Sequence, residues 1–148
     1  MRDWPGFDGP LVHVPDPISE SRLVEELAAS IAPRLRVLSV SPRVGVPYQV
    51  SATDLLGVLR QFGFPTPVVL GEGLGCLVAL ILAAWYPTHV GALILLEPKY
   101  DPPPGESSEA RALRDCPPDV ARLRARVQCP VIEPTHVEEL KIRLAALP

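Results

Sequence analysis

The sequence lacks several features that would mark particular classes of protein. There is no excess of positive charge, since the formal net charge is −3; nothing in the charge balance favours nucleic acid or an anionic membrane surface as a partner. The apolar stretch 76–85 is too short to span a bilayer, and Pro87 closes it. Residues 1–6 do not begin the long apolar core of a signal peptide. We therefore expect a cytoplasmic protein.

Cysteine is also scarce. The three cysteines, Cys76, Cys116 and Cys129, are an odd number at scattered spacings. This pattern favours reduced thiols over a disulfide framework, which agrees with a cytoplasmic location. We expect neither a metal ion nor a cofactor.

Proline, in contrast, is abundant, with 19 residues that stand mostly at the junctions between apolar runs. Proline fixes φ and prevents a helix from continuing, so the pattern indicates ordered elements separated by sharp boundaries. A chain of 148 residues is long enough for one domain with a real core.

Short apolar runs alternate with amphipathic ones along the chain. The runs predict strands at 11–14, 36–40, 67–71, 92–96 and 130–133, and helices at 19–32, 51–62, 74–86 and 136–147, with two short helices within 107–127. Such alternation predicts a doubly wound, mainly parallel sheet of about five strands with helices on both faces. Ligands of these folds bind at the carboxyl ends of the strands, so the turn after Leu70 is the first candidate site.

The segment 67–98 resembles the central part of an α/β-hydrolase. Its strand runs into the glycine-rich turn Gly71-Glu72-Gly73-Leu74-Gly75, a buried helix, the pair Tyr86-Pro87, and the next strand. The resemblance implies a shortened α/β-hydrolase fold in a single domain over 1–148. Within it we expect a core at 9–98, a reduced cap or linker at 99–128, and a last strand with a C-terminal helix at 129–148.

The departures from that family concern its catalytic residues. The nucleophile position of the turn is Gly73, which has no side-chain oxygen or sulfur and cannot begin covalent acyl transfer. His13 is followed by valine where the resemblance implies the glycine of an oxyanion loop. Glu72, Glu133 and His136 are possible remnants of an acid–histidine system. The alternative for each is a solvated carboxylate or histidine with no role in chemistry.

Three interpretations of function follow. The first is a non-catalytic binding or interaction protein, similar in its Gly-x-Gly-x-Gly turn to the N-myc downstream-regulated proteins. It would bind a small carboxylate or ester at His13, Gly73, Leu74 and Gly75, where backbone N–H groups begin a helix. The second is an esterase-like hydrolase with a non-serine acid/base site that uses His13, Glu72 or His136. The third is a truncated hydrolase, or a subunit that needs a partner.

The expected sheet has open edges. Family members run to about twice this length, and the resemblance implies that the first two strands, most of the cap and the last strand are absent. The strands at 36–40 and 131–133 would then form the edges. Because an uncovered edge invites pairing with another chain, we expect a homodimer formed through one of them.

Overall fold

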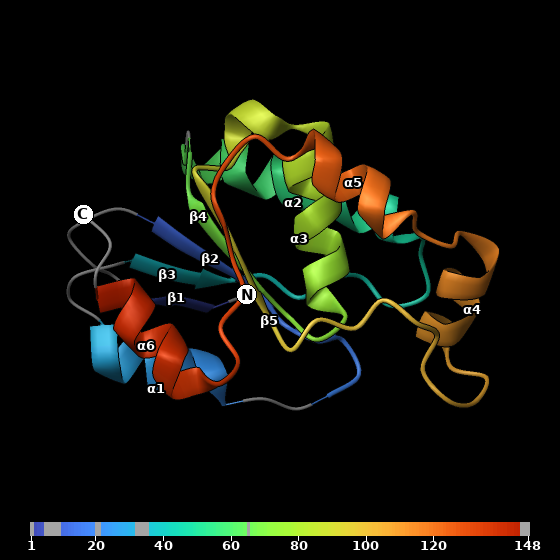
Figure 1. The fold of residues 1–148 in the computed structure, drawn as a ribbon, viewed down its shortest axis with the longest axis horizontal. Coiled ribbons are helices and arrows are strands. Elements are labelled where there is room, and N and C mark those ends of the chain that lie inside the picture. The colour runs from blue at the N-terminus through green and yellow to red at the C-terminus, as the bar shows by residue number, and fades with distance from the viewer. Residues whose placement is uncertain (1, 5–9, 20–21, 32–35, 65, 146–148) are drawn as a thin grey trace.

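A computed structural model describes the chain except residues 1, 5–9, 20–21, 32–35, 65 and 146–148. Its centre is a six-stranded sheet in the order β1-β3-β2-β4-β5-β6 (Figure 1). Five of these strands are parallel, and only the first pairs antiparallel, with β3. The strands are β1 (Arg2–Trp4), β2 (Pro10–Val14), β3 (Arg36–Ser39), β4 (Val68–Glu72), β5 (Ala92–Leu96) and β6 (Val131–Ile132).

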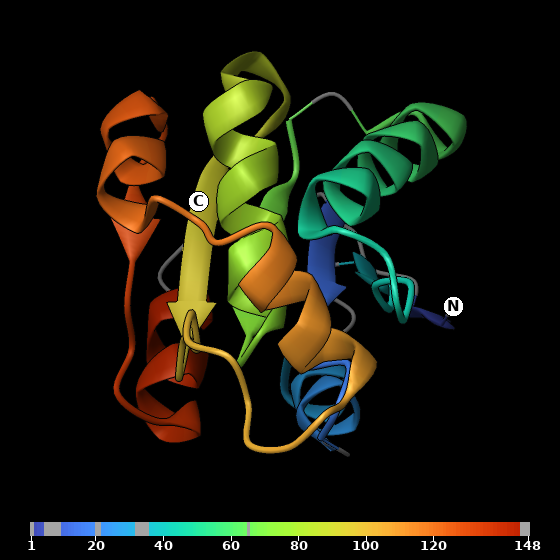
Figure 2. The same cartoon turned by 90° about the vertical axis from the view of Figure 1, so that its right-hand side faces the viewer.

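Helices cover both faces of the sheet. They are α1 (Leu23–Ile31), α2 (Tyr48–Phe62), α3 (Gly75–Trp85), α4 (Ser108–Asp115), α5 (Val120–Arg126) and α6 (Val137–Ala145), with a short 3₁₀ turn at Pro87–His89. Helices α2 and α3 pack on one face, with α5 against α3, and α1 and α6 pack on the other (Figures 1 and 2). The predicted α/β architecture with helices on both faces is therefore confirmed.

Most element boundaries lie close to their predictions. Helix α2 begins at Tyr48, before the predicted residue 51, because Pro47 with φ −56° sets the chain up for a helix. Helix α1 begins later than predicted, at Leu23. Residues 20 and 21, which belong to the predicted helix, lie outside the described residues.

The predicted edge at 36–40 is wrong. Strand β1 pairs antiparallel with β3, with Arg2 opposite Ser39, so the described edges of the sheet are β1 and β6. A three-residue strand is too short to leave a periodic signal in the sequence. Homodimer formation through an open edge stays a prediction, now concerning β1 or β6.

The core depends on the apolar helix α3. Ten of its eleven residues, Gly75 to Ala84, are buried, as expected for a helix that is apolar on all sides. Strand β5, with all five residues buried, lies beneath it. None of the helices in the described part of the chain has the length and apolar character needed to cross a bilayer.

Glycine lets α3 begin directly against the sheet. A Cβ on Gly75 would overlap the carbonyl oxygen of Val14 and lie 2.6 Å from that of Pro15. A Cβ on Gly71 would lie 2.6 Å from the Cα of Cys76. All of these neighbours are backbone atoms, so a side chain could be accommodated only if the helix and the strand moved apart.

We predict that Gly75→Ala lowers the free energy of unfolding by about 3 kcal/mol, because the new methyl group overpacks the contact between α3 and β2. The matched control is Gly57→Ala on the exposed side of α2, where a Cβ meets nothing within 4 Å. That change should stabilise the protein by roughly 1 kcal/mol through helix propensity. Urea unfolding followed by circular dichroism measures both, and equal effects would contradict the close-approach explanation.

Candidate functional site

The glycine-rich turn between β4 and α3 forms a tight elbow at the carboxyl edge of the sheet. Gly73 has φ +59°, in the left-handed region that favours glycine. Its N–H donates to the carbonyl of Leu96 at 3.1 Å, and its own carbonyl accepts the N–H of Lys99 at 3.1 Å. The elbow is therefore fixed to the chain that leaves β5.

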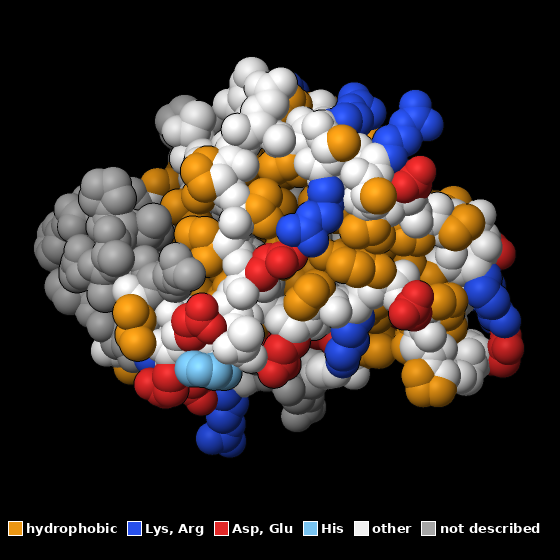
Figure 3. Space-filling model, viewed as in Figure 1, with side chains coloured by type: hydrophobic (Ala, Val, Ile, Leu, Met, Phe, Trp, Pro, Cys, Tyr) orange, Lys and Arg blue, Asp and Glu red, His pale blue; other side chains and the backbone are white. Residues whose placement is uncertain are grey.

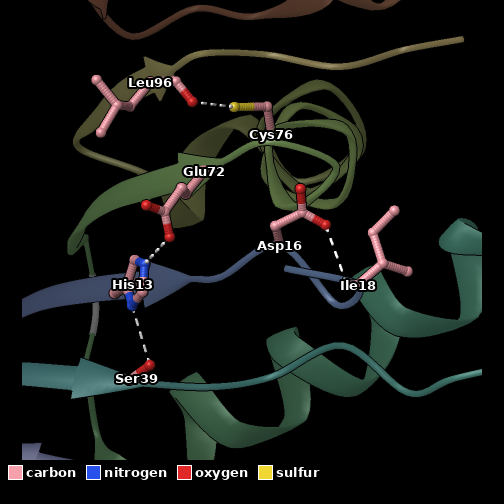
Figure 4. A network of polar contacts seen from close by, with 7 residues as sticks. All are labelled: His13, Asp16, Ile18, Ser39, Glu72, Cys76 and Leu96. Carbon is pink, nitrogen blue, oxygen red and sulfur yellow. Dashed lines mark hydrogen bonds and ion pairs between the residues drawn. The ribbon is translucent and has the colours of Figure 1, made fainter. Parts of the chain in front are cut away.

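A carboxylate occupies the space that a side chain at the elbow would need. A Cβ built on Gly73 would overlap Oδ2 of Asp16 and lie 2.8 Å from its Cγ. Asp16 follows β2, and its side chain is only 4% exposed. Figure 4 shows the carboxylate beside the first turn of α3. Negative charge is favoured at a helix N-terminus, so this is a physically reasonable place for an ionised aspartate.

Lys99 provides the opposite charge. Its Nζ lies 3.4 Å from Oδ2 of Asp16, although the lysine side chain is 55% exposed. Glu97, with φ 48°, adopts the left-handed region and turns the chain after β5. Such a conformation is uncommon outside glycine and costs on the order of 1 kcal/mol. That turn brings Lys99 to both Gly73 and Asp16.

A hollow of about 500 Å³ opens beside the elbow. It is lined by Ile18 and Leu74 on one side and by the proline-rich loop 98–104 on the other. Its volume falls within the range of small-molecule sites, and its walls are mainly apolar with a few polar groups. Lys99 and Asp101 are the charged residues of this lining, so the hollow adjoins the Asp16–Lys99 pair.

Tyr100 lines this hollow, but its hydroxyl is buried beneath the surface. Burial raises the pKa of its hydroxyl to about 12, so the group keeps its proton at neutral pH. The hydroxyl is buried and has no hydrogen-bond partner among the described residues. The charged side chains that act on this hydroxyl, Arg124 and Glu133, do not line the hollow, so the hydroxyl is not offered to a ligand there.

Two of the predicted site residues, His13 and Glu72, come together across adjacent strands. Nδ1 of His13 lies 3.0 Å from Oγ of Ser39, and Nε2 lies 3.4 Å from Oε1 of Glu72 (Figure 4). His13 is 2% exposed. The bridge therefore joins the carboxyl ends of β3, β2 and β4.

This bridge faces away from α3. His13, Ser39 and Glu72 each stand two residues after a core residue of the α1/α6 face, namely Leu11, Val37 and Leu70. Side chains two residues apart in a strand share a face. The bridge and the packing of α3 are thus on opposite sides of the sheet, and both ring nitrogens of His13 are engaged in the bridge.

The structure does not bring Glu133 and His136 together as a pair. Oε1 of Glu133 accepts from the guanidinium of Arg124 at 2.7 Å. Nδ1 of His136 accepts the N–H of Glu139 at 3.1 Å, which caps the start of α6. Both residues are exposed, and each has a local structural partner.

Cys76 packs in the core. Its Sγ donates to the carbonyl of Leu96 at 3.5 Å, and burial raises the pKa of the thiol to about 12. A protonated, buried thiol is a poor nucleophile, so the residue acts as a small apolar side chain. Among the residues that the structure describes, no group of three histidine, cysteine or acidic side chains could hold a metal ion.

Asp16 and Lys99 were not predicted from the sequence. Asp16 lies three residues after His13, just past a strand that ends at the ligand edge, which is the only signal in the sequence. Its proximity to Gly73 depends on β2 and β4 being neighbours, and the sequence alone does not specify that strand order.

No family model matches the chain, and no curated protein matches it. Several solved structures, in contrast, are similar to the chain. An N-formylmaleamic acid deformylase from Pseudomonas putida matches with a TM-score of 0.67 and 17% identity over 89% of this chain and 75% of its own. A thermophilic esterase from Thermogutta terrifontis matches with a TM-score of 0.57 and 21% identity, over 69% of this chain and 41% of its own. An enol-lactonase from Burkholderia xenovorans matches with a TM-score of 0.58 and 16% identity, over 65% of this chain and 40% of its own.

These similarities show that the chain has an α/β-hydrolase fold, as predicted. The chain spans less than half the length of the esterase and of the lactonase. At such low identity the likeness concerns the fold alone, so the chemistry of this site has to be argued from its own residues.

We predict that Gly73→Ser lowers the free energy of unfolding by about 3 kcal/mol. The serine would have to adopt the left-handed φ of this position, and its Cβ would overlap Asp16. Asp16→Ala removes the two nearest of these atoms, Oδ2 and Cγ, and leaves only the Cβ at 2.9 Å. In a double-mutant cycle, the cost of Gly73→Ser should therefore fall by about 1 kcal/mol or more when Asp16 is alanine. Urea unfolding of the four proteins measures the coupling. An unchanged cost of Gly73→Ser in the Asp16→Ala background would contradict the arrangement.

Proposed function

We propose that this protein is a non-catalytic binding or interaction protein that uses an α/β-hydrolase fold without a nucleophile. One observation carries the proposal: the elbow residue is Gly73, and the space beside it is filled by the carboxylate of Asp16. Covalent acyl transfer needs a side-chain nucleophile at the elbow. It also needs room and donors for a developing negative charge, and a fixed carboxylate there opposes that charge.

The hollow beside the elbow is the proposed binding site, and its chemistry suits a small carboxylate or ester with an apolar body. The apolar walls would take the body of the ligand. The ammonium of Lys99, which is 55% exposed, would pair with a carboxylate or donate to a carbonyl oxygen. The esterase of similar fold was solved with malate bound, which is a small carboxylate.

This proposal moves the ligand charge away from the start of α3. Among the predicted binding residues, Leu74 lines the hollow, whereas Gly73 and Gly75 are covered by Asp16 and by the backbone of β2. A carboxylate placed against the α3 N-terminus would meet that of Asp16 without a compensating cation, whereas at Lys99 the ammonium would lie between the ligand and Asp16 as a shared partner. His13 supports the strands beneath the site and does not line the hollow.

Titration with hexanoate and with methyl hexanoate tests this proposal by heteronuclear NMR. We expect saturable shifts for both in residues that line the hollow. Lys99→Met should weaken hexanoate binding at least about fivefold, since a charge-assisted contact is lost, and leave the ester nearly unaffected.

The matched control is Lys141→Met, which removes the same charge on α6, where Lys141 pairs with Glu138. It should change neither affinity. Failure of both probes to give saturable shifts would count against the hollow as a binding site, and equal effects of the two lysine variants would reduce the role of Lys99 to general electrostatics.

A second candidate is a hydrolase that uses a non-serine acid/base site. The observation in its favour is the pairing of His13 with Glu72, because a histidine oriented by a carboxylate is a common general base. Its weakness is burial, since His13 is 2% exposed and both its ring nitrogens are engaged.

Hydrolysis of p-nitrophenyl butyrate separates the two candidates. We expect the parent protein to be no faster than buffer, with no change on His13→Ala, Glu72→Gln or His136→Ala. A rate above buffer that falls at least about tenfold in His13→Ala or His136→Ala, with circular dichroism unchanged, would instead support the hydrolase.

A further inference from the structure

We propose a second ligand site, independent of the elbow, in a hollow between α2, α3 and α5 that takes a small aromatic molecule bearing a carboxylate or phosphate. The hollow measures about 210 Å³. It is smaller than the roughly 300–1,000 Å³ of drug-sized sites, which limits the occupant to a small molecule. Its lining consists of Gln49, Ile81, Trp85, Pro117, Pro118, Asp119, Arg122, Leu123 and Arg126.

An exposed tryptophan forms the apolar part of this hollow. Trp85 is the last residue of α3 and is 39% exposed, although the ten residues before it in the helix are buried. Ile81 stands one turn earlier in α3, and Leu123 contributes from α5. An indole beside aliphatic side chains provides a flat apolar surface on which a ring can stack.

Two arginines provide the charge. Arg122 and Arg126 are four residues apart on α5 and therefore lie on the same side of the helix. Neither side chain forms an ion pair with the residues that the structure describes, whereas Arg124 between them pairs with Glu133 at 2.7 Å. Guanidinium groups bind carboxylate and phosphate oxygens in a forked geometry, so this pair selects for an anion.

Asp119 does not cancel this preference. Its carboxylate accepts the N–H of Arg122 at 3.1 Å and caps the start of α5. With two arginines and one aspartate, the lining has a net charge of +1 in a chain of net charge −3. Basic side chains gather over α5 at the upper right of Figure 3.

A buried polar atom indicates a further contact. The side-chain oxygen of Gln49, in the first turn of α2, is buried and has no hydrogen-bond partner among the described residues. An unpaired buried acceptor is costly, and a hydroxyl donor on the ligand would satisfy it. A hydroxylated aromatic acid matches all three features of the hollow.

The indole N–H signals of the ¹⁵N-labelled protein test the proposal, with 4-hydroxybenzoate as the probe. The chain has two tryptophans, Trp85 in the hollow and Trp4 in β1, and Trp85→Phe assigns the signals. We expect the Trp85 signal to shift saturably and the Trp4 signal to stay in place. Arg122→Gln and Arg126→Gln should each weaken binding about fivefold or more.

Two controls make the result specific. Arg111→Gln removes the same charge from the exposed surface of α4, outside the hollow, and should leave the affinity unchanged. Lys99→Met should also leave it unchanged, which separates this site from the elbow. Because the substituted residues are exposed, spectral dispersion should report intact folding for every variant.

Three results would overturn the proposal. One is a shift that grows without saturation, and another is an Arg111→Gln effect as large as that of Arg126→Gln. The third is equally tight binding of uncharged 4-hydroxybenzyl alcohol, which would show that the arginines do not select the ligand.

Discussion

The close approach of α3 to the carboxyl ends of β2 and β4 is the constraint on which the rest of the structure depends. It is possible only because Gly71 and Gly75 present no side chain to the opposing backbone. The approach buries nearly all of α3 and forces the chain through a left-handed residue at Gly73. The helix start therefore lies against the loop after β2, and whatever that loop carries becomes part of the elbow.

That loop carries Asp16, and its carboxylate gives the elbow a negative charge. A carboxylate of 4% exposure needs compensation, which here comes from the N–H of Ile18, the nearby helix N-terminus and the ammonium of Lys99. The left-handed Glu97 places Lys99, so part of the backbone strain of this region serves the ion pair. In the function proposed above, this charge pair and the hollow beside it form the binding site.

The sequence predicted the fold more fully than the site because periodicity is local and the site is not. Strand 92–96 was predicted with its correct bounds, since a run of five apolar residues has few alternative explanations. Strand β1 was missed because three residues make no period. The contact between Asp16 and Gly73 and the bridge from His13 to Glu72 both require β2 to lie between β3 and β4, an order that no local pattern specifies.

The two faces of the sheet divide the polar groups between distinct tasks. On the α1/α6 face, His13 fixes the ends of three strands from within, and its burial makes it a support for the carboxyl edge. On the α3 side, the half-solvated Lys99 lines a hollow large enough for a ligand. Polar groups that are buried with all their partners stabilise a fold, whereas an exposed ammonium with three donors keeps hydrogen-bonding capacity for a ligand beside its one partner, Asp16. Under the proposed function, Lys99 and the hollow are therefore where binding is to be sought, whereas the pair of His13 and Glu72 supports the carboxyl edge of the sheet.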